Sequence, residues 1–499
     1  IENEAALAGL PESAKAAARQ SAAAAGKPGW LFTLEFPSYF PVITYADDRE
    51  LRREMYEAYV TRASDAGPNA GQWDNTELME KILKLRHEVA RLLGFANYAE
   101  RSIATKMAAS TQQVLDFLHD LAQRSHPIAR KDVQEVRDFA RTHYGADNLE
   151  SWDIPYYSEK LSEHTYAISQ EELKPYFPEH RVLSGMFAVV QRLYGLEIQQ
   201  VTGVETWHPD VRFFEIKDSQ GTVRGQFYLD LYARPHKRGG AWMDECLTRK
   251  RTPQGIQTPV AYLTCNFSSP IGADPALFTH DEVQTLFHEF GHGLHHMLTR
   301  VDYPSVAGIS GVAWDAVELP SQFMENWCWE REALNLISGH YKTGESLPPA
   351  LFDKMLAAKN FQSGMQMARQ LEFSIFDFRM HLEYDPAKGG RVYQILDEVR
   401  KEVAVLNPPS FNRFPHSFSH IFAGGYAAGY YSYKWAEVLS SDAFSKFEEN
   451  GIFDRKTGLE FMSAILEQGG SREPMELFIE FRGREPTIDA LLRHAGIAA

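Results

Sequence analysis

Hydrophobic residues recur at three- and four-residue spacing along most of the chain, with charged residues between them. This period is typical of amphipathic helices that bury one face. On this pattern we expect helices at 48–63, 76–93, 111–143, 181–194, 279–298, 325–337, 352–381, 423–447 and 458–466. The pattern therefore predicts a mainly α-helical fold.

Strand patterns are confined to one part of the chain. The stretches 211–217 and 223–231 flank a short loop that contains Gly221, which predicts a β-hairpin. The apolar run 259–267 is bounded by Pro and Ser and predicts a further strand. We expect one small β-sheet at about 210–270.

Composition and charge exclude several classes of protein. The chain of 499 residues has 51 Lys and Arg against 67 Asp and Glu, a net charge of −16, which disfavours nucleic acid as a partner. It has no apolar run of 18 residues, so we expect no membrane partner. Three cysteines far apart in the sequence, Cys246, Cys265 and Cys328, do not form a disulfide framework and favour a reducing compartment.

The segment 279–292 carries the most specific chemistry. Thr279 and Glu282 have the spacing of a capping box and predict a helix start. His288 and His292 follow at i and i+4, so both imidazoles leave one helix face and can meet one metal ion. Glu289 lies about 100° around the helix, where it faces a water beside the metal. The pattern predicts a zincin with Glu289 as general base. The alternative without a metal site is two surface histidines on an acidic helix.

A catalytic zinc needs a third protein ligand and an open position. The third His of metzincins is absent, so we expect a downstream carboxylate. Glu318 is the best candidate, with Glu325 and Glu330 as competitors, although Asp315 and Glu318 could instead form a capping box in a register that Pro320 leaves ambiguous. Asp315 is also a candidate to orient a ligand imidazole. For His296, one turn beyond His292, we expect a solvated position or one behind the ligands.

Several motifs together resemble a known family. The matching segments are His288-Glu289-Phe290-Gly291-His292, Glu318-Leu319-Pro320-Ser321-Gln322, Glu325-Asn326-Trp327, and the stretches 152–157, 228–232 and 420–435. This set is similar to the thimet oligopeptidase family of zinc metallopeptidases. The resemblance implies an elongated multi-helix body with a small sheet beside a deep substrate channel. It also implies one Zn²⁺ per chain, with Glu318 as the third ligand.

The same resemblance divides the chain into two regions. Residues 1–155 would form a helical channel wall, which lacks part of the N-terminal region that family members carry. Residues 156–499 would form the catalytic region with the sheet and the zinc site.

The resemblance also assigns residues that act on the substrate. Tyr433 is implied as the preferred donor to the oxyanion, with Tyr426 and His420 also facing the substrate. Tyr430 is less clearly assigned, and Tyr431 is expected to serve packing.

Glycines accompany these tyrosines. Gly424, Gly425 and Gly429 disfavour a helix and suggest a hinge or a close approach of backbone. The strand near Ala261–Phe267 could pair with the substrate main chain, which suits broad specificity.

The predicted function is a zinc-dependent endopeptidase that hydrolyses short unstructured oligopeptides, including signal-peptide fragments. By resemblance we expect a cytoplasmic monomer that acts in peptide catabolism. Two alternatives stay open: a dipeptidyl carboxypeptidase with the same motifs, and a catalytically silent peptide-binding protein. The silent protein is disfavoured by four intact residues, His288, Glu289, His292 and Glu318.

Overall fold

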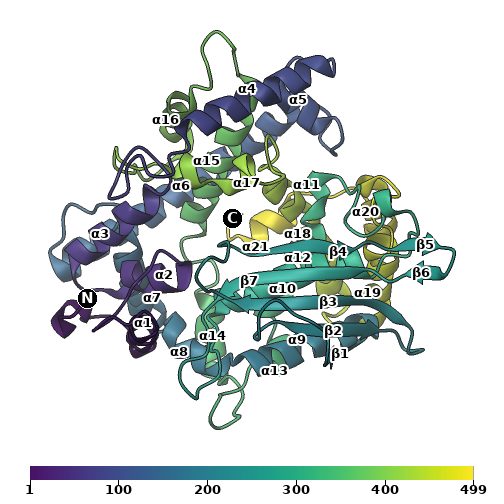
Figure 1. Ribbon diagram of the computed structural model, residues 1–499, viewed down its shortest axis with the longest axis horizontal. Coiled ribbons are helices and arrows are strands. Elements are labelled where there is room, and N and C mark those ends of the chain that lie inside the picture. The colour runs from purple at the N-terminus through teal and green to yellow at the C-terminus, as the bar shows by residue number, and fades with distance from the viewer. Residues whose placement is uncertain (498–499) are drawn as a thin grey trace. The chain divides into compact units, whose positions relative to one another are not determined.

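A computed structural model describes residues 1–497 and is mainly helical, with two small sheets (Figure 1). The chain forms two compact units. Unit 1 consists of Ile1–Ala167, Ala358–Tyr433 and the end of the chain from Ala495, and unit 2 consists of Ile168–Ala357 and Lys434–His494. The predicted mainly helical fold is confirmed, whereas the substrate channel and the functional division near residue 155 stay predictions.

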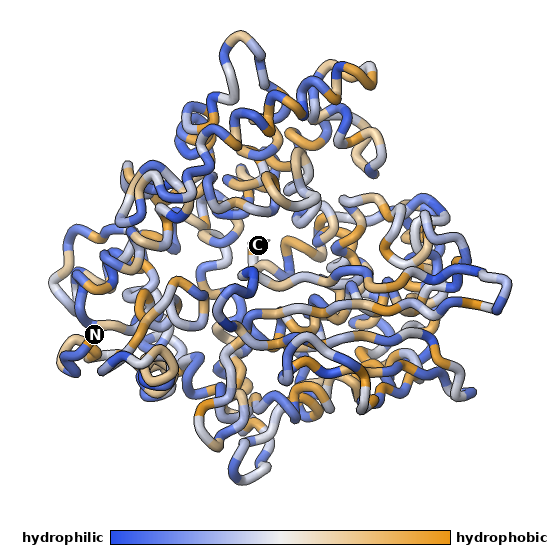
Figure 2. The backbone as a smooth tube through the Cα atoms, viewed as in Figure 1, coloured by the Kyte–Doolittle hydropathy of each residue, from blue (hydrophilic) through white to orange (hydrophobic). Residues whose placement is uncertain are grey.

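Unit 1 is built from helices. They are α1 (Glu12–Ala24), α2 (Phe36–Tyr45), α3 (Arg49–Val60), α4 (Thr76–Leu92), α5 (Tyr98–Ile103), α6 (Thr111–Tyr144), α7 (Ile154–Tyr166), α15 (Ser363–Leu382), α16 (Val392–Val403) and α17 (Ser419–Phe422). The long helices α6 and α15 pack closely at Gly364 of α15. A Cβ at this position would lie only 2.5 Å from the backbone nitrogen of Ala129 in α6. Hydrophobic and hydrophilic residues alternate along these helices (Figure 2), and α4 leaves Leu85 and Leu92 exposed.

Unit 2 combines helices with both sheets. Its helices are α8 (Gln170–Leu173), α9 (Glu179–Tyr194), α10 (His280–Met297), α11 (Trp314–Val317), α12 (Leu319–Glu325), α13 (Arg331–Ile337), α14 (Pro349–Ala357), α19 (Arg455–Phe461), α20 (Pro474–Arg482) and α21 (Asp489–His494). Helix α18 (Ser432–Asn450) begins at the last two residues of a unit 1 segment and continues in unit 2. Among residues 1–497, no helix is both long enough and apolar enough to cross a membrane.

Several predicted helices differ from the structure. The stretch 325–337 forms a 3₁₀-helix over Asn326–Trp329 and then α13. The stretch 352–381 forms α14 and α15 with a break between them, where Gln362 has a left-handed backbone with φ of 57°. The stretch 423–447 is helical only from Ser432, because the glycine-rich part before it forms turns. Near the end of the chain, α19 begins at Arg455 and is followed by a π-helix over Met462–Leu466.

The larger sheet has the strand order β1-β2-β3-β7-β4. The predicted strands appear as β2 (Arg212–Lys217), β3 (Val223–Tyr232) and β7 (Val260–Phe267), and β1 (Glu197–Val201) and β4 (Trp242–Leu247) complete the sheet. The small strands β5 (Lys250–Thr252) and β6 (Gly255–Gln257) form a separate hairpin. Strand β7 lies between a parallel neighbour, β3, and an antiparallel one, β4. The prediction that the substrate pairs with Ala261–Phe267 is therefore wrong, since both edges of this strand are already bonded.

Helix α10 packs on one face of this sheet (Figure 1). Phe290 of α10 lies edge-on to Phe227 of β3, with ring centroids 5.5 Å apart. A Cβ on Gly293 would lie 3.1 Å from Leu263 of β7. The sheet thus supports the helix that carries the HExxH motif.

Candidate metal centre

Helix α10 begins as the sequence predicts. The side chain of Thr279 accepts a hydrogen bond from the backbone of Glu282, and the side chain of Glu282 accepts one from the backbone of Thr279. Two turns later, His288 and His292 project from one face, with ring centroids 5.0 Å apart and ring planes at 83°. The two imidazoles can therefore approach a common point from different directions.

Glu318 supplies a carboxylate at that point. It lies where α11 ends and α12 begins, with Pro320 in the first turn of α12, a position that Pro tolerates. Its buried Oε2 lies 3.1 Å from Nε2 of His288 and 3.1 Å from Nε2 of His292. Asp315 does not cap a helix here, because α11 begins one residue before it.

This arrangement fits a zinc ion. Ligands about 2.0–2.1 Å from a tetrahedral zinc are separated by about 3.3 Å, close to the two N–O distances observed. Two imidazoles and one carboxylate are also a donor set of catalytic zinc sites that keep a fourth position open. Among residues 1–497, His288, His292 and Glu318 form the one group of three or more such side chains whose ligand atoms all lie within 4.8 Å of one another.

Gly291 allows the two ligand-bearing helices to cross closely. A Cβ at this position would lie 2.4 Å from the carbonyl oxygen of Pro320 and 2.6 Å from Cα of Ser321. Both contacts are to backbone, which cannot yield as a flexible side chain can. The glycine inside the motif is thus a packing requirement that brings Glu318 to the histidines.

Helix α12 orients the ligands as well as supplying one. The hydroxyl of Ser321, fully buried, lies 2.9 Å from Oε2 of Glu318 and donates to Glu318. Oε1 of Glu325 lies 2.6 Å from Nδ1 of His288, so this carboxylate faces the ring nitrogen opposite the metal position. Sequence reasoning treated Glu325 only as a rival ligand. The i, i+3, i+7 spacing of Glu318, Ser321 and Glu325 was the available signal, since it places all three on one helix face.

Glu289 has the surroundings expected of a proton acceptor. The residue is 4% exposed, and its Oε2 has no hydrogen-bond partner in the structure. Burial raises the pKa of Glu289, although the neighbouring His288 and His292 oppose this effect. A buried carboxylate oxygen without a partner costs free energy unless a ligand or water uses it, which agrees with a role as base.

The charges of the candidate metal ligands are complementary. Burial would lower the pKa of His288, but its contacts with Glu318 and Glu325 raise it well above its usual range. Burial would raise the pKa of Glu318, but His292 and His288 hold it well below its usual range. Glu318 is thus a carboxylate in a buried position that favours a cation beside it.

The histidines after the motif are structural. His296 is fully buried, and its Nε2 lies 3.0 Å from the carbonyl oxygen of Leu247 in β4. The solvated position expected for His296 is wrong, because this buried ring ties the end of α10 to the sheet, whereas the alternative of a position behind the ligands stays a prediction. Burial lowers the pKa of the neighbouring His295 to about 3. Glu330 lies outside the ligand group, and the orienting role suggested for Asp315 stays a prediction.

The tyrosines singled out in the sequence lie together in unit 1. The rings of Tyr426 and Tyr433 stack at 4.8 Å and 19°, and His420 lies edge-on to Tyr433 at 6.1 Å. The hydroxyl of Tyr430 donates to Oε1 of Gln370 at 3.1 Å. Tyr431 is fully buried against Phe378, as expected of a packing residue.

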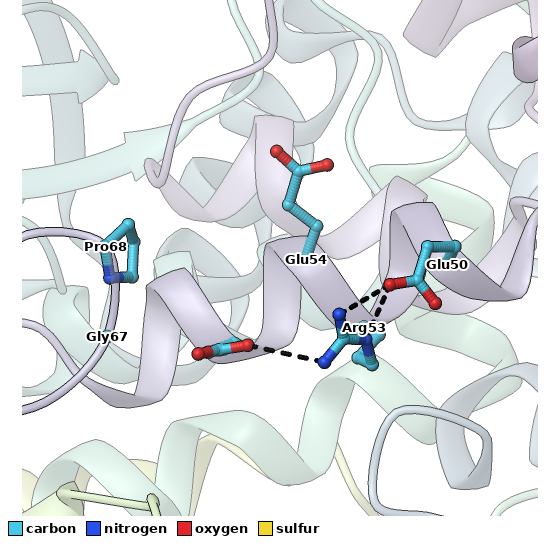
Figure 3. Close-up of a pocket in the computed structure, with 6 residues that line it drawn as sticks. Glu50, Arg53, Glu54, Gly67 and Pro68 are labelled. Atoms are coloured by element: carbon cyan, nitrogen blue, oxygen red, sulfur yellow. Dashed lines mark hydrogen bonds and ion pairs between the residues drawn. The ribbon is translucent and has the colours of Figure 1, made fainter.

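Unit 1 also has a surface pocket of about 420 Å³ that contains none of these residues (Figure 3). Its wall is largely acidic, with Glu50 and Glu54 on α3 and Pro68 in the following loop. Arg53 forms ion pairs with Glu50 and Glu57 along the same helix. The pocket is thus an ion-paired surface of α3.

Comparisons with known proteins agree with the geometry. Residues 42–497 match the model of peptidase family M3. Oligopeptidase A of Salmonella typhimurium is 62% identical over 498 residues, covering 100% of this chain and 73% of that protein. The dipeptidyl carboxypeptidase of Escherichia coli is 32% identical, covering 98% of this chain and 72% of that protein. Among solved structures, PZ peptidase A is similar in fold, with a TM-score of 0.62 at 16% identity over 97% of this chain and 73% of that one.

Proposed function

Since this chain belongs to peptidase family M3 and is a metallo-oligopeptidase, we propose that its metal is zinc, one ion per chain, held by His288, His292 and Glu318. The main observation behind this proposal is that Oε2 of Glu318 lies 3.1 Å from Nε2 of each of the two histidines. When bound, zinc supplies a Lewis acid that lowers the pKa of a coordinated water.

The chain's own groups then move the proton and stabilise charge. Glu289 takes the proton of the attacking water and passes it to the leaving amine. The hydroxyl of Tyr433 donates to the developing oxyanion, with Tyr426 and His420 contacting the substrate. The shared cluster of these three rings supports treating them as one group.

The proposed substrates are short unstructured peptides, including fragments of signal peptides. The sheet order leaves β4 as an edge strand, so we propose that β4 pairs with the substrate main chain in place of β7. Such pairing reads backbone and tolerates many side chains. We further propose that the protein acts as a monomer in the cytoplasm, a location supported by its three free cysteines.

Internal cleavage is favoured over release of C-terminal dipeptides. The identity of 62% to an oligopeptidase A exceeds the 32% to a dipeptidyl carboxypeptidase over nearly the same length. A silent peptide-binding protein is disfavoured, since it would not need the buried Glu289 oxygen. Mapping the cleaved bonds of a blocked peptide by mass spectrometry separates the two peptidase activities.

The decisive experiment combines metal analysis with a quenched-fluorescence peptide assay. We expect about one zinc per chain, loss of cleavage with a chelator and recovery with added zinc. Glu289→Gln should retain zinc but lose at least about 100-fold in kcat, the general-base contribution. Glu332→Gln, an exposed change on α13, serves as the control. Cleavage by Glu289→Gln at the parent rate would refute the assignment of the base.

A further inference from the structure

A buried aspartate holds the main chain just before the tyrosine-bearing start of α18. Asp377 of α15 is fully buried. Its Oδ1 accepts the amide of Ala428 at 2.9 Å, and its Oδ2 accepts those of Gly429 at 2.9 Å and Tyr430 at 3.0 Å. Three successive amides thus converge on one carboxylate, the arrangement of a backbone anion nest. Ala428 adopts a φ of 48°, which is unfavourable for a residue with a Cβ and is stabilised here by these bonds.

The opposite side of this segment is also fixed. Nζ of Lys106 lies 2.8 Å from Oγ of Ser102 and donates to it. The hydroxyl of Ser102 then donates to the carbonyl oxygen of Ala428 at 2.8 Å. Asp377 from α15 and Ser102 from α5 therefore hold residues 427–430 by amides on one side and carbonyls on the other.

Helix α15 also seats the ring of Tyr430. Gln370, Phe373 and Asp377 lie on one face of α15 at i, i+3 and i+7. Gln370 accepts the Tyr430 hydroxyl, and the ring of Phe373 lies 5.9 Å away, edge-on to Tyr430. One helix face thus fixes both the backbone and the ring of Tyr430.

His381 and Arg86 lie next to Asp377 within unit 1. Nδ1 of His381 lies 3.1 Å from Oδ1 of Asp377, and NH1 of Arg86 lies 3.1 Å from Nε2 of the same ring. Since Arg86 can only donate, Nε2 accepts and Nδ1 carries the proton, which it donates to the main-chain carbonyl oxygen of Asp377 at 2.8 Å. The three amide hydrogen bonds to the Asp377 carboxylate are of the strong, charge-assisted kind, which makes this anchor firm.

We propose that Asp377 is a positioning residue for the peptidase reaction: it fixes the backbone of 428–430 and so sets the place from which Tyr433 meets the substrate. This inference rests on the proposed function of the tyrosine cluster. Residues 427–430 are buried and hydrogen-bonded, so they cannot form the hinge that the glycines suggest. Any such hinge is confined to the exposed stretch 423–425.

The test is Asp377→Asn. The side chain keeps its size, but its NH₂ group replaces one of the two oxygens that accept the amides of 428–430. We expect faster hydrogen exchange at the amides of 428–430, unchanged zinc content, and a kcat lowered about 10- to 100-fold with KM within about threefold. Asp132→Asn is the matched control. Oδ2 of Asp132 accepts the amide of Met365, so this change also removes a charged bond to the main chain but leaves the tyrosine segment intact.

The outcomes separate the two hypotheses. If Asp377→Asn exchanges faster at 428–430 yet keeps the kcat of the parent, or if its exchange is unchanged, the positioning role is wrong. If the parent itself cleaves no peptide, the proposed function fails, and exchange alone then decides whether Asp377 holds the segment. Should Asp377→Asn not fold, Ser102→Ala removes the opposite contact and must lower kcat without raising KM for the proposal to stand.

Discussion

Glu325 faces Nδ1 of His288 at 2.6 Å, while Nε2 of the same ring faces Glu318. The two carboxylates lie seven residues apart, at either end of α12, so the two nitrogens of one imidazole are bound by one helix. A carboxylate on the far nitrogen fixes the tautomer and the direction of a metal-binding imidazole. The proposed metal centre therefore includes a residue, Glu325, that is not itself a proposed ligand.

Glu325→Gln should weaken zinc binding about tenfold or more, because the neutral amide orients His288 less firmly. Competition with a chromophoric chelator measures this affinity. Glu332→Gln should bind zinc as the parent does. Equal affinity of Glu325→Gln and the parent would show that the contact with His288 does not matter.

Gly291→Ala should destabilise unit 2 and weaken zinc binding. The new methyl group would meet backbone atoms of Pro320 and Ser321 at 2.4 and 2.6 Å, so α12 must move and carry Glu318 with it. Overpacking of this kind costs about 1–3 kcal/mol. Urea unfolding and zinc titration measure the two effects.

Gly293→Ala is the matched control, since its Cβ would meet only side-chain atoms of Leu263 and Met297 at 3.1–3.4 Å. These side chains can adjust, so the loss of stability should be smaller. A larger loss in Gly293→Ala than in Gly291→Ala would contradict the importance of the helix crossing.

Tyr433→Phe should lower kcat about 100-fold or more with little change in KM, because a donor to the oxyanion acts only in the transition state. Tyr431→Phe removes a hydroxyl from the neighbouring buried ring and should leave kcat near that of the parent. Steady-state kinetics on one internally quenched peptide compare both. If the two variants behave alike, Tyr433 has no special role.

The lowered pKa of Asp230 predicts that the protein loses folding stability in acid. Burial would raise its pKa, but bonds from Arg234, Lys237 and Trp207 lower it to about 2, below the usual 3.8. A lowered pKa adds stability above about pH 3.8 that is lost as the pH falls through about 2, and the shift corresponds to about 2 kcal/mol. Asp230→Asn should therefore be less stable than the parent in urea at pH 7, with a difference that shrinks near pH 2.5. Asp244→Asn, an exposed change in β4, should show no such difference.

Local features of the metal centre are predictable from sequence because they depend on neighbouring residues. The capping box at Thr279 and the i, i+4 histidines are of this kind, and both appear in the structure. Spacing alone could not choose between Glu318 and Glu325, because the choice depends on how α12 crosses α10. The roles proposed for Tyr433, Tyr426 and His420 came from the family resemblance and stay proposals.

In the fold, too, local patterns were predictable from sequence and long-range pairing was not. Strand β1 was missed because its residues are mostly exposed and polar, so it lacks the alternation that marks a half-buried strand. The interior place of β7 could not be read from sequence order, because β7 pairs with both β3 and β4 and so lies between two strands that precede it in the chain. The predicted helix 423–447 begins too early, because the apolar period continues through glycines that form turns in the structure.

Glu318, Ser321 and Glu325 all belong to one short stretch that includes α12. A ligand, the hydroxyl that steadies it and the carboxylate that aims a second ligand therefore shift together if this stretch rotates or detaches. Partial loosening would not leave a weakened centre with two good ligands; it would abolish all three contributions at once. Retention of the proposed ion would therefore report whether this stretch of about two helical turns remains packed against α10.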